Sequence, residues 1–164
     1  MILIQLSILL LLLYIIFILS YSMLRGAPFA ALGLDRILTM MQLLDVKSGK
    51  KLVDLGSGDG RIVHEAAKLK VHAYGYEINP FIYLVSKIKL RKMKNAKIEL
   101  ADLWKQDLSQ FDYVTVWGVP PMMGRLEKKL RKELKKGAKV VSNHNRFPNW
   151  KYSKNMNDVY LYIK

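Results

Sequence analysis

The chain has 164 residues, which is enough for a single domain. It contains no cysteine, which excludes disulfides and cysteine-based catalysis, and its 27 basic and 13 acidic residues give a formal net charge of +14. All of this charge lies on residues 25–164, because residues 2–24 carry none. The three histidines are scattered without the spacing of metal ligands, so no metal is expected.

Residues 1–24 are predicted to form a transmembrane helix. Twenty-three consecutive uncharged and mostly apolar residues give roughly 35 Å of helix, and the hydrocarbon core of a bilayer measures about 30 Å. A signal peptide is the alternative, but a charged leading region and a small-residue cleavage site are missing. Positive charge follows the helix from Arg25, so we expect the remaining chain on the cytoplasmic side, or on the matrix side of a mitochondrial membrane.

Residues 25–33 are predicted to be a juxtamembrane linker, and residues 34–164 the folded domain. Nine linker residues extend over at most about 30 Å, so the domain stays close to the bilayer. Anionic lipid headgroups would attract the basic runs at 87–94 and 127–136, although a solvated helix face is the simpler explanation of either run alone. The basic charge also permits nucleic acid, but no stacking-aromatic motif or known nucleic-acid module supports that partner.

Helices and strands are predicted to alternate along the domain. Asp35 is expected to cap the first helix, and Ile62, Ala66 and Leu69 to form the buried face of the second. The expected helices span 36–44, 61–69, a segment from Pro80 with apolar positions 82, 85, 88 and 93, and a segment with leucine at 126, 130 and 134 that Gly137 closes. The expected strands span 51–55, 71–77, 98–103, 112–117, 139–142 and 159–163. This order predicts an α/β fold with a doubly wound, mostly parallel sheet of order 3-2-1-4-5, plus a C-terminal antiparallel strand.

Residues 52–63, Leu-Val-Asp-Leu-Gly-Ser-Gly-Asp-Gly-Arg-Ile-Val, predict a buried strand, a glycine-rich turn and a helix. A dinucleotide fingerprint needs glycine where Arg61 stands, and a phosphate loop needs Gly-Lys-Ser/Thr. Two acids near the turn oppose a pyrophosphate and suit a ligand with an ammonium or sulfonium charge, such as S-adenosylmethionine. A plain strand-to-helix turn is the alternative. The residues predicted to bind this ligand are Asp54, Gly56, Ser57, Gly58, Asp59 and Gly60.

Two further acids are predicted to lie at neighbouring strand ends. Glu77, followed by Ile78, stands twenty-three positions after Asp54, where an acid can accept hydrogen bonds from both ribose hydroxyls. Asp102, followed by Leu103, is expected at the end of the third strand, within reach of an adenine amino group. A single acid would be a weak signal, because acids are common in loops. Three acids at successive strand ends together predict the S-adenosylmethionine site.

Several segments together carry a resemblance to a known family. They are Gly-Ala-Pro-Phe at 26–29, residues 52–63, Gly-Tyr-Glu-Ile-Asn-Pro at 75–80, Asp-Leu-Trp at 102–104, Gly-Val-Pro at 118–120, Met-Met at 122–123, Leu-Glu at 126–127 with Leu130, and Phe-Pro-Asn-Trp at 147–150. Residues 26–164 thereby resemble the small seven-β-strand protein-lysine methyltransferases that modify the ATP synthase c subunit or the adenine nucleotide translocase, and their archaeal relatives. The resemblance implies the class I S-adenosylmethionine-dependent methyltransferase fold and transfer of methyl groups to lysines of membrane or membrane-proximal proteins.

One segment departs from this family. Its members often follow the first Pro-aromatic pair with a second proline, a hydroxyl residue and another proline, whereas residues 30–33 read Ala-Ala-Leu-Gly. The resemblance implies that this segment helps to close over the cofactor and shapes the lysine entrance. Substrate choice is therefore the property that this departure most affects.

Methyl transfer to a lysine requires a neutral amine about 3 Å from the methyl carbon, and desolvation in a narrow apolar channel favours the neutral form. The candidate lining residues are Phe29, Trp117, Pro120, Pro121 and Met122. Trp117 and Pro120 are predicted to position the substrate, with a core role for Trp117 as the alternative, and no side chain stands out as a general base.

Other substrates remain as alternatives. Methylation of adenine or of glutamine amides uses Asn/Asp-Pro-Pro-aromatic after the fourth strand, whereas residues 119–122 read Val-Pro-Pro-Met, which disfavours a planar amine. A membrane-soluble small molecule, such as a lipid or a quinone, is a second alternative. A membrane scaffold that retains the pocket without catalysis is a third.

Overall fold

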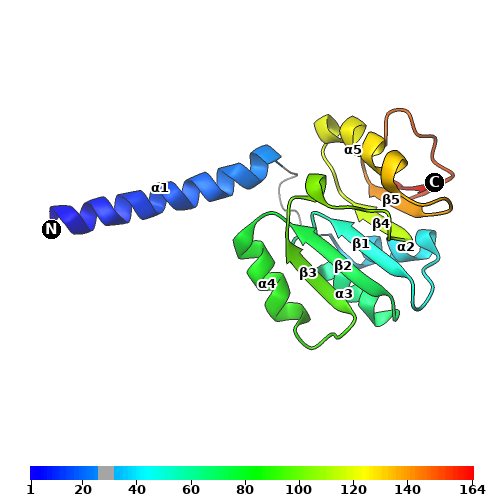
Figure 1. Ribbon diagram of the computed structural model, residues 1–164, viewed down its shortest axis with the longest axis horizontal. Coiled ribbons are helices and arrows are strands. Elements are labelled where there is room, and N and C mark those ends of the chain that lie inside the picture. Colours follow the sequence, from blue (N-terminus) through cyan, green and yellow to red (C-terminus); the bar gives the residue numbers. More distant parts are fainter. Residues whose placement is uncertain (26–31) are drawn as a thin grey trace.

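The computed structural model describes residues 1–25 and 32–164, with the backbone alone for residue 15 and residues 17–25. Within these residues one seven-stranded sheet has the order β3-β2-β1-β4-β5-β7-β6 (Figure 1). Its strands are β1 (Lys51–Leu55), β2 (His72–Glu77), β3 (Ala96–Leu100), β4 (Tyr113–Val116), β5 (Lys139–Asn143), β6 (Lys154–Met156) and β7 (Val159–Ile163). Strands β1 to β5 are parallel and β7 pairs antiparallel with β5, which confirms the predicted order. The short edge strand β6 was not predicted.

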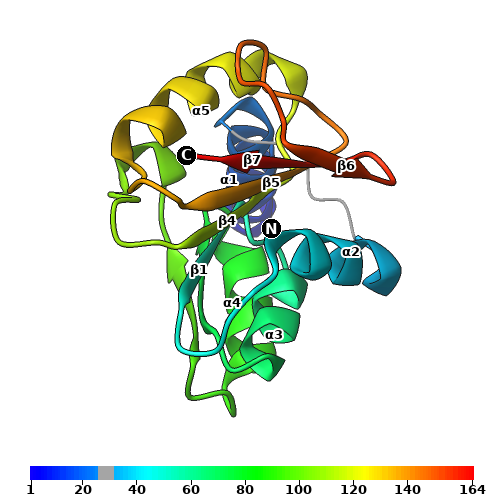
Figure 2. The same cartoon turned by 90° about the vertical axis from the view of Figure 1, so that its right-hand side faces the viewer.

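Helices cover both faces of this sheet. They are α2 (Leu34–Leu44), α3 (Arg61–Lys68), α4 (Pro80–Leu90) and α5 (Pro120–Glu133), with a short 3-10 helix η1 (Leu103–Lys105) after β3. Helices α2 and α3 lie on one side of the sheet and α5 on the other (Figure 2). The sheet is therefore the middle layer of three, as the doubly wound prediction requires.

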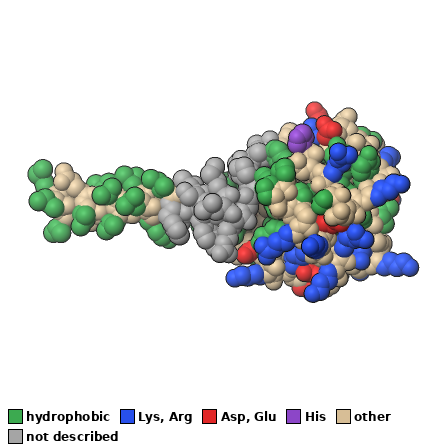
Figure 3. Space-filling model, turned by 90° about the horizontal axis from the view of Figure 1, so that it is seen from above, with side chains coloured by type: hydrophobic (Ala, Val, Ile, Leu, Met, Phe, Trp, Pro, Cys, Tyr) green, Lys and Arg blue, Asp and Glu red, His purple; other side chains and the backbone are tan. Residues whose placement is uncertain are grey.

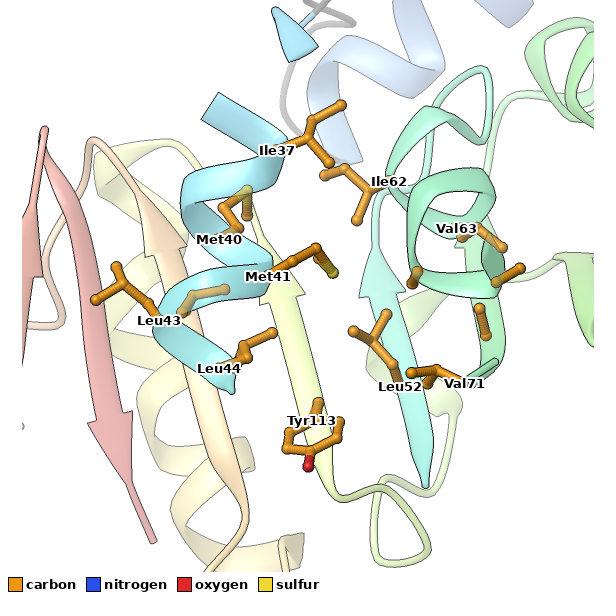
Figure 4. Packing of buried hydrophobic residues seen from close by; sticks show 14 of the residues in the cluster. Ile37, Met40, Met41, Leu43, Leu44, Leu52, Ile62, Val63, Val71 and Tyr113 are labelled. Atoms are coloured by element: carbon orange, nitrogen blue, oxygen red, sulfur yellow. The ribbon is translucent and has the colours of Figure 1, made fainter. Parts of the chain in front are cut away.

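The core on the α2 and α3 side forms because strand side chains alternate between faces. Leu52 belongs to this core, whereas its neighbour Val53 faces α5. Figure 4 shows four apolar side chains of α2 that point toward β1, β4 and α3. They are Ile37, Met40, Met41 and Leu44, and they are at most 4% exposed.

The core on the α5 side includes the Phe-Pro-Asn-Trp segment of the family resemblance. The ring of Phe147 stacks on Trp150 with centroids 5.6 Å apart, and both rings contact Tyr162. The backbone N–H of Phe147 donates to Tyr162 Oη at 3.1 Å, and buried Glu127 accepts from the backbone N–H of Asn149 at 2.8 Å. This segment therefore has a structural role, because its two aromatic rings pack on β7 in the core on the α5 side.

Several local predictions were wrong. Helix α2 begins at Leu34, so Asp35 lies in its first turn and Gly33 is the N-cap residue. Leu69, predicted to be buried, is 46% exposed because α3 ends at Lys68. Strand β3 ends at Leu100, two residues before Asp102.

Helix α4 differs most from its predicted packing. Two of its predicted apolar positions, Val85 and Ile88, are 55% and 62% exposed, and Met93 lies beyond the last helical residue. The inner face of α4 is formed instead by partly or fully buried residues, namely Ile82, Tyr83, Ser86 and Leu90.

The N-terminal segment forms the helix α1 (Ile2–Arg25), as predicted for residues 1–24. In the part of the chain that the structure describes, no helix is long and apolar enough to cross a membrane, so the predicted transmembrane span is not supported. Most of the predicted linker 25–33 lies outside the described residues, including Phe29 and the departing Ala-Ala pair.

A substitution at Gly75 of β2 can test how tightly the sheet packs on the turn that follows β1. A Cβ atom at this position would lie 2.5 Å from Ile98 Cδ1 and 2.6 Å from Ser57 Cβ. We expect Gly75→Ala to lower the free energy of unfolding by about 1–3 kcal/mol, measured by urea denaturation, because the neighbours must shift. Gly33→Ala is the matched control, since nothing lies within 4 Å of its added Cβ. Equal unfolding midpoints for both variants would contradict this packing argument.

Candidate functional site

The candidate site lies at the carboxyl ends of the parallel strands. The strand order reverses between β1 and β4, and in open α/β sheets ligands bind at such a switch point. The turn 56–60 follows β1, Glu77 ends β2, and Trp117 follows β4. The topology thus brings the predicted residues to one edge of the sheet.

The backbone N–H groups of the glycine-rich turn point into the protein. Those of Gly56 and Ser57 both donate to the carbonyl oxygen of Tyr76 at 3.0 Å, and that of Gly60 donates to the carbonyl oxygen of Ser57 at 2.9 Å. A phosphate-binding loop instead directs its N–H groups at the ligand. This turn is therefore unsuited to phosphate, as its sequence predicted.

Gly56 leaves room for a ligand, whereas its neighbour Ser57 is buried. Gly56 has a φ of +83°, and a Cβ atom there would have nothing within 4 Å. Ser57 is only 4% exposed, yet its Oγ has no hydrogen-bond partner among the described residues. This hydroxyl packs against β2, because a Cβ atom added at Gly75 would lie 2.7 Å from it, so the open space belongs to Gly56 alone.

Glu77 is held by two backbone N–H groups. Its Oε2 accepts from Gly58 at 2.8 Å and its Oε1 accepts from Asn79 at 2.8 Å, and the residue is 8% exposed. Asn79 in turn caps α4, because its Oδ1 accepts from the N–H groups of Phe81 and Ile82. Each carboxylate oxygen still has a second lone pair, so Glu77 is oriented and able to accept from hydroxyl groups. Half-buried Ile78 lies between these two residues.

Asp102 lies beside the end of β2. The N–H of Ala101 donates to the carbonyl oxygen of Glu77 at 2.8 Å, which fixes the segment after β3 next to Glu77. Asp102 Oδ1 then accepts from the N–H of Trp104 at 3.0 Å and caps η1, whose first residue is half-buried Leu103. The third predicted acid is thus at the same edge as Glu77.

Asp54 is the most deeply buried acid of the site. It is 3% exposed, and its Oδ1 accepts from Thr115 Oγ1 at 2.7 Å. Burial raises the pKa of Asp54 to about 7, since the hydrogen bond from Thr115 only partly offsets desolvation and nearby Glu77 and Asp59 add repulsion. Thr115 was missed at the sequence level, although one polar residue in an otherwise apolar strand was an available signal.

Asp59 differs from Asp54 in having two cationic partners. Arg61 Nε donates to Oδ1 at 2.9 Å, and Lys89 Nζ donates to Oδ2 at 3.0 Å. Burial acts to raise the pKa of Asp59, but these cations outweigh it and hold the pKa at about 2. Arg61 Nη1 also donates to the carbonyl oxygen of Leu32 at 2.6 Å. Asp59 therefore links α3 to α4, and Arg61 extends this link to residue 32. The negative charge of Asp59 is compensated by these two cations.

The two predicted positioning residues have different surroundings. Trp117 is half-buried and packs against the core on the α2 and α3 side, whereas Pro120 is exposed at the start of α5. Between them, the carbonyl oxygen of Gly118 accepts from Asn145 Nδ2 at 2.8 Å. Asn145 thus fixes the segment after β5 to the segment after β4, a contact that no motif in the sequence indicated.

Comparison with known proteins gives the family of this chain. Residues 54–154 match the model of the ANTKMT methyltransferase domain. The human lysine N-methyltransferase of the ATP synthase c subunit is 41% identical over 126 residues, which are 75% of this chain and 54% of that protein. The protein-lysine N-methyltransferase of Saccharolobus islandicus (strain REY15A) is 33% identical, with 76% of this chain and 85% of that protein covered.

Further relatives agree with this match. Mouse adenine nucleotide translocase lysine N-methyltransferase is 36% identical over 75% of this chain and 55% of its own length, so the chain spans about half of the mammalian relatives. Among solved structures, an RNA methyltransferase from Salinibacter ruber in complex with S-adenosyl-L-homocysteine has a TM-score of 0.74 and 26% identity, with 81% of this chain and 91% of that chain covered.

The raised pKa of Asp54 predicts a pH-dependent stability. Between about pH 4 and pH 7 the folded chain holds a proton on Asp54 that the unfolded chain has lost, so stability falls as the pH rises through this window. We expect Asp54→Asn to remove this contribution, which is at most about 1.4 kcal/mol per pH unit. Urea denaturation at several pH values measures it, with exposed Asp35→Asn as the control. Parallel stability curves for wild type and Asp54→Asn would contradict the assignment.

Proposed function

This chain belongs to the ANTKMT methyltransferase family, and we propose that it is an S-adenosylmethionine-dependent methyltransferase that acts on lysine side chains of proteins. The observation that carries the proposal is the arrangement of three acids, Asp54, Glu77 and Asp102, around the glycine-rich turn at one edge of the sheet. Lysine as the acceptor follows from the curated relatives described above, all three of which are lysine N-methyltransferases by name.

The residues of the candidate site fit the proposed cofactor. S-adenosylmethionine, when bound, supplies a methyl group on a positively charged sulfur. Glu77 would accept from the ribose hydroxyls, because two backbone N–H groups already fix its carboxylate. Asp54 and Glu77 would provide the negative charge, since Arg61 and Lys89 compensate that of Asp59. The open space beside Gly56 completes the fit.

The segment after β4 favours an aliphatic amine over a planar one. Val119-Pro-Pro-Met122 offers no amide or carboxylate to bond a planar amino group and no aromatic ring to stack on it. Trp117 and Pro120 would instead shape an apolar entrance in which desolvation lowers the pKa of a lysine and favours its neutral, nucleophilic form. The proposal therefore assigns these two residues to positioning and assigns no general base.

We further propose that α1 holds the domain at a membrane. Every side chain of residues 1–14 is exposed, and the large apolar ones among them are between 51% and 94% exposed. Figure 3 shows this apolar helix projecting from a domain that carries many lysine and arginine side chains on the face in view. So much exposed apolar surface needs a cover, and a lipid bilayer provides one. The side of the membrane that the domain faces stays a prediction.

The proposed role of Glu77 predicts the effect of its removal. We expect Glu77→Ala to weaken S-adenosylhomocysteine binding by about 1–3 kcal/mol in isothermal titration calorimetry, because a hydrogen-bonding group to the ligand is lost. Glu99→Ala is the control, since Glu99 lies on β3 and pairs with Lys97 at its surface. Circular dichroism would verify that Glu77→Ala is folded. A loss of only a few tenths of a kcal/mol in the folded variant would contradict the ribose assignment.

Transfer of radiolabelled methyl groups tests the whole proposal. Incubated with labelled S-adenosylmethionine and a membrane extract, the full chain should transfer label to protein bands and specifically to lysine. Gly56→Arg should abolish this transfer, because its side chain would enter the open space of the crevice.

Each other destination of the label contradicts the proposal in its own way. Label in the organic phase would indicate a lipid or quinone substrate, and label in RNA would indicate the activity named for the Salinibacter protein. No transfer to any fraction would indicate a scaffold without catalysis.

A further inference from the structure

Helix α4 has an apolar face that the domain leaves uncovered. Its inner side packs on the sheet through residues such as Tyr83 and Leu90, which belong to or contact the core. Its outer side carries Phe81, Leu84, Val85 and Ile88, which are 48%, 55%, 55% and 62% exposed. The spacing i, i+3, i+4, i+7 aligns these four residues, called here the α4 outer face, in one stripe along the helix.

Basic residues border the α4 outer face. Lys87 and Lys89 lie on either side of the stripe by helical spacing, and Arg91, Lys92 and Lys94 follow the helix. No acidic residue occurs between 78 and 98. Helices that lie in the plane of a membrane interface typically combine Phe and Leu on one side with flanking lysines. The composition therefore suits an anionic lipid surface.

The chain also brings α1 close to this face. Leu32 is the first residue that the structure describes after the gap at 26–31, and its carbonyl oxygen accepts from Arg61. Arg61 and Lys89 of α4 both donate to the carboxylate of Asp59. Arg25, the last residue of α1, is seven positions from Leu32, a distance of at most about 25 Å. Figure 1 places α4 on the side of the domain from which α1 extends.

We propose that the α4 outer face docks on the anionic surface of the membrane that α1 contacts. This inference rests on the membrane association in the proposed function, and it adds a second contact that orients the domain. Apolar side chains of such helices enter about 5–10 Å into the headgroup boundary. Lys87 and the basic residues after the helix would meet lipid phosphates there, while Lys89 stays paired with Asp59. A helix that faces water normally carries polar residues on its outer side, so the exposed apolar stripe is better explained if α4 faces a membrane.

Docking would also select the substrate. Asn79 caps α4 and adjoins Glu77, so the start of this helix belongs to the same edge of the sheet as the candidate site. A bilayer against α4 therefore places that edge near the headgroups. The lysines that reach it would be those of membrane proteins, close to the lipid surface.

Site-specific fluorescence in the full chain tests this docking. Because the natural chain has no cysteine, Val85→Cys on the α4 outer face and Lys132→Cys on the exposed side of α5 can each carry one environment-sensitive dye. Vesicles of phosphatidylcholine and phosphatidylglycerol would contain a lipid with a quencher on its upper acyl chain. We expect several-fold stronger quenching at position 85 than at position 132, and weaker quenching at 85 in phosphatidylcholine alone.

Other results would overturn the inference. Equal quenching at the two positions would show that α1 alone holds the domain, without a preferred orientation. A disulfide or crosslink that joins two unlabelled copies of the Val85→Cys variant at position 85, in place of quenching, would assign the face to self-association. Since quenching does not depend on methyl transfer, a chain that docks but transfers no methyl group would overturn the proposed activity and leave the docking intact.

Discussion

The carboxylate of Glu77 is the interaction on which the candidate site depends. One oxygen accepts from Gly58 in the turn after β1, and the other accepts from Asn79 at the start of α4. Two loops that are far apart in sequence are thereby fixed to one side chain. A buried carboxylate without such donors would be costly, so the two N–H groups hold Glu77 in one orientation. The Glu77 carboxylate is consequently oriented before any ligand binds.

Burial and neighbouring cations decide which acids at this edge of the sheet are ionised. Asp54 and Asp59 flank the same turn, yet the pKa of Asp54 is raised to about 7 and that of Asp59 is lowered to about 2. Among the residues that the structure describes, Asp54 accepts from the hydroxyl group of Thr115 and has no cationic partner, so a cation arriving beside it would favour its ionised form. Asp59 is already paired with Arg61 and Lys89, so its role is structural. Binding of a positively charged cofactor near Asp54 should therefore be coupled to proton release.

The sequence predicted the elements well where one strong pattern acted alone. The bounds of β1 and β7 were correct, because short apolar runs there are delimited by polar and glycine residues. The packing of α4 was predicted wrongly because apolar residues occur on both of its sides, and periodicity cannot then indicate which side is buried. The pairing of Asp59 with Lys89 could not be predicted either, since Lys89 is thirty positions away and only the folded chain brings it near.

Under the proposed membrane association, location would be the main source of selectivity. The segment after β4 offers mainly proline, methionine and valine, which shape an entrance but read few features of a substrate sequence. A domain held at a bilayer by α1 meets membrane-bound substrates at a high effective concentration, as linked binding modules do. Contact through the α4 outer face would further restrict its orientation. Discrimination between lysines would then arise from their height above the lipid surface, with the apolar entrance required only to accept an aliphatic amine.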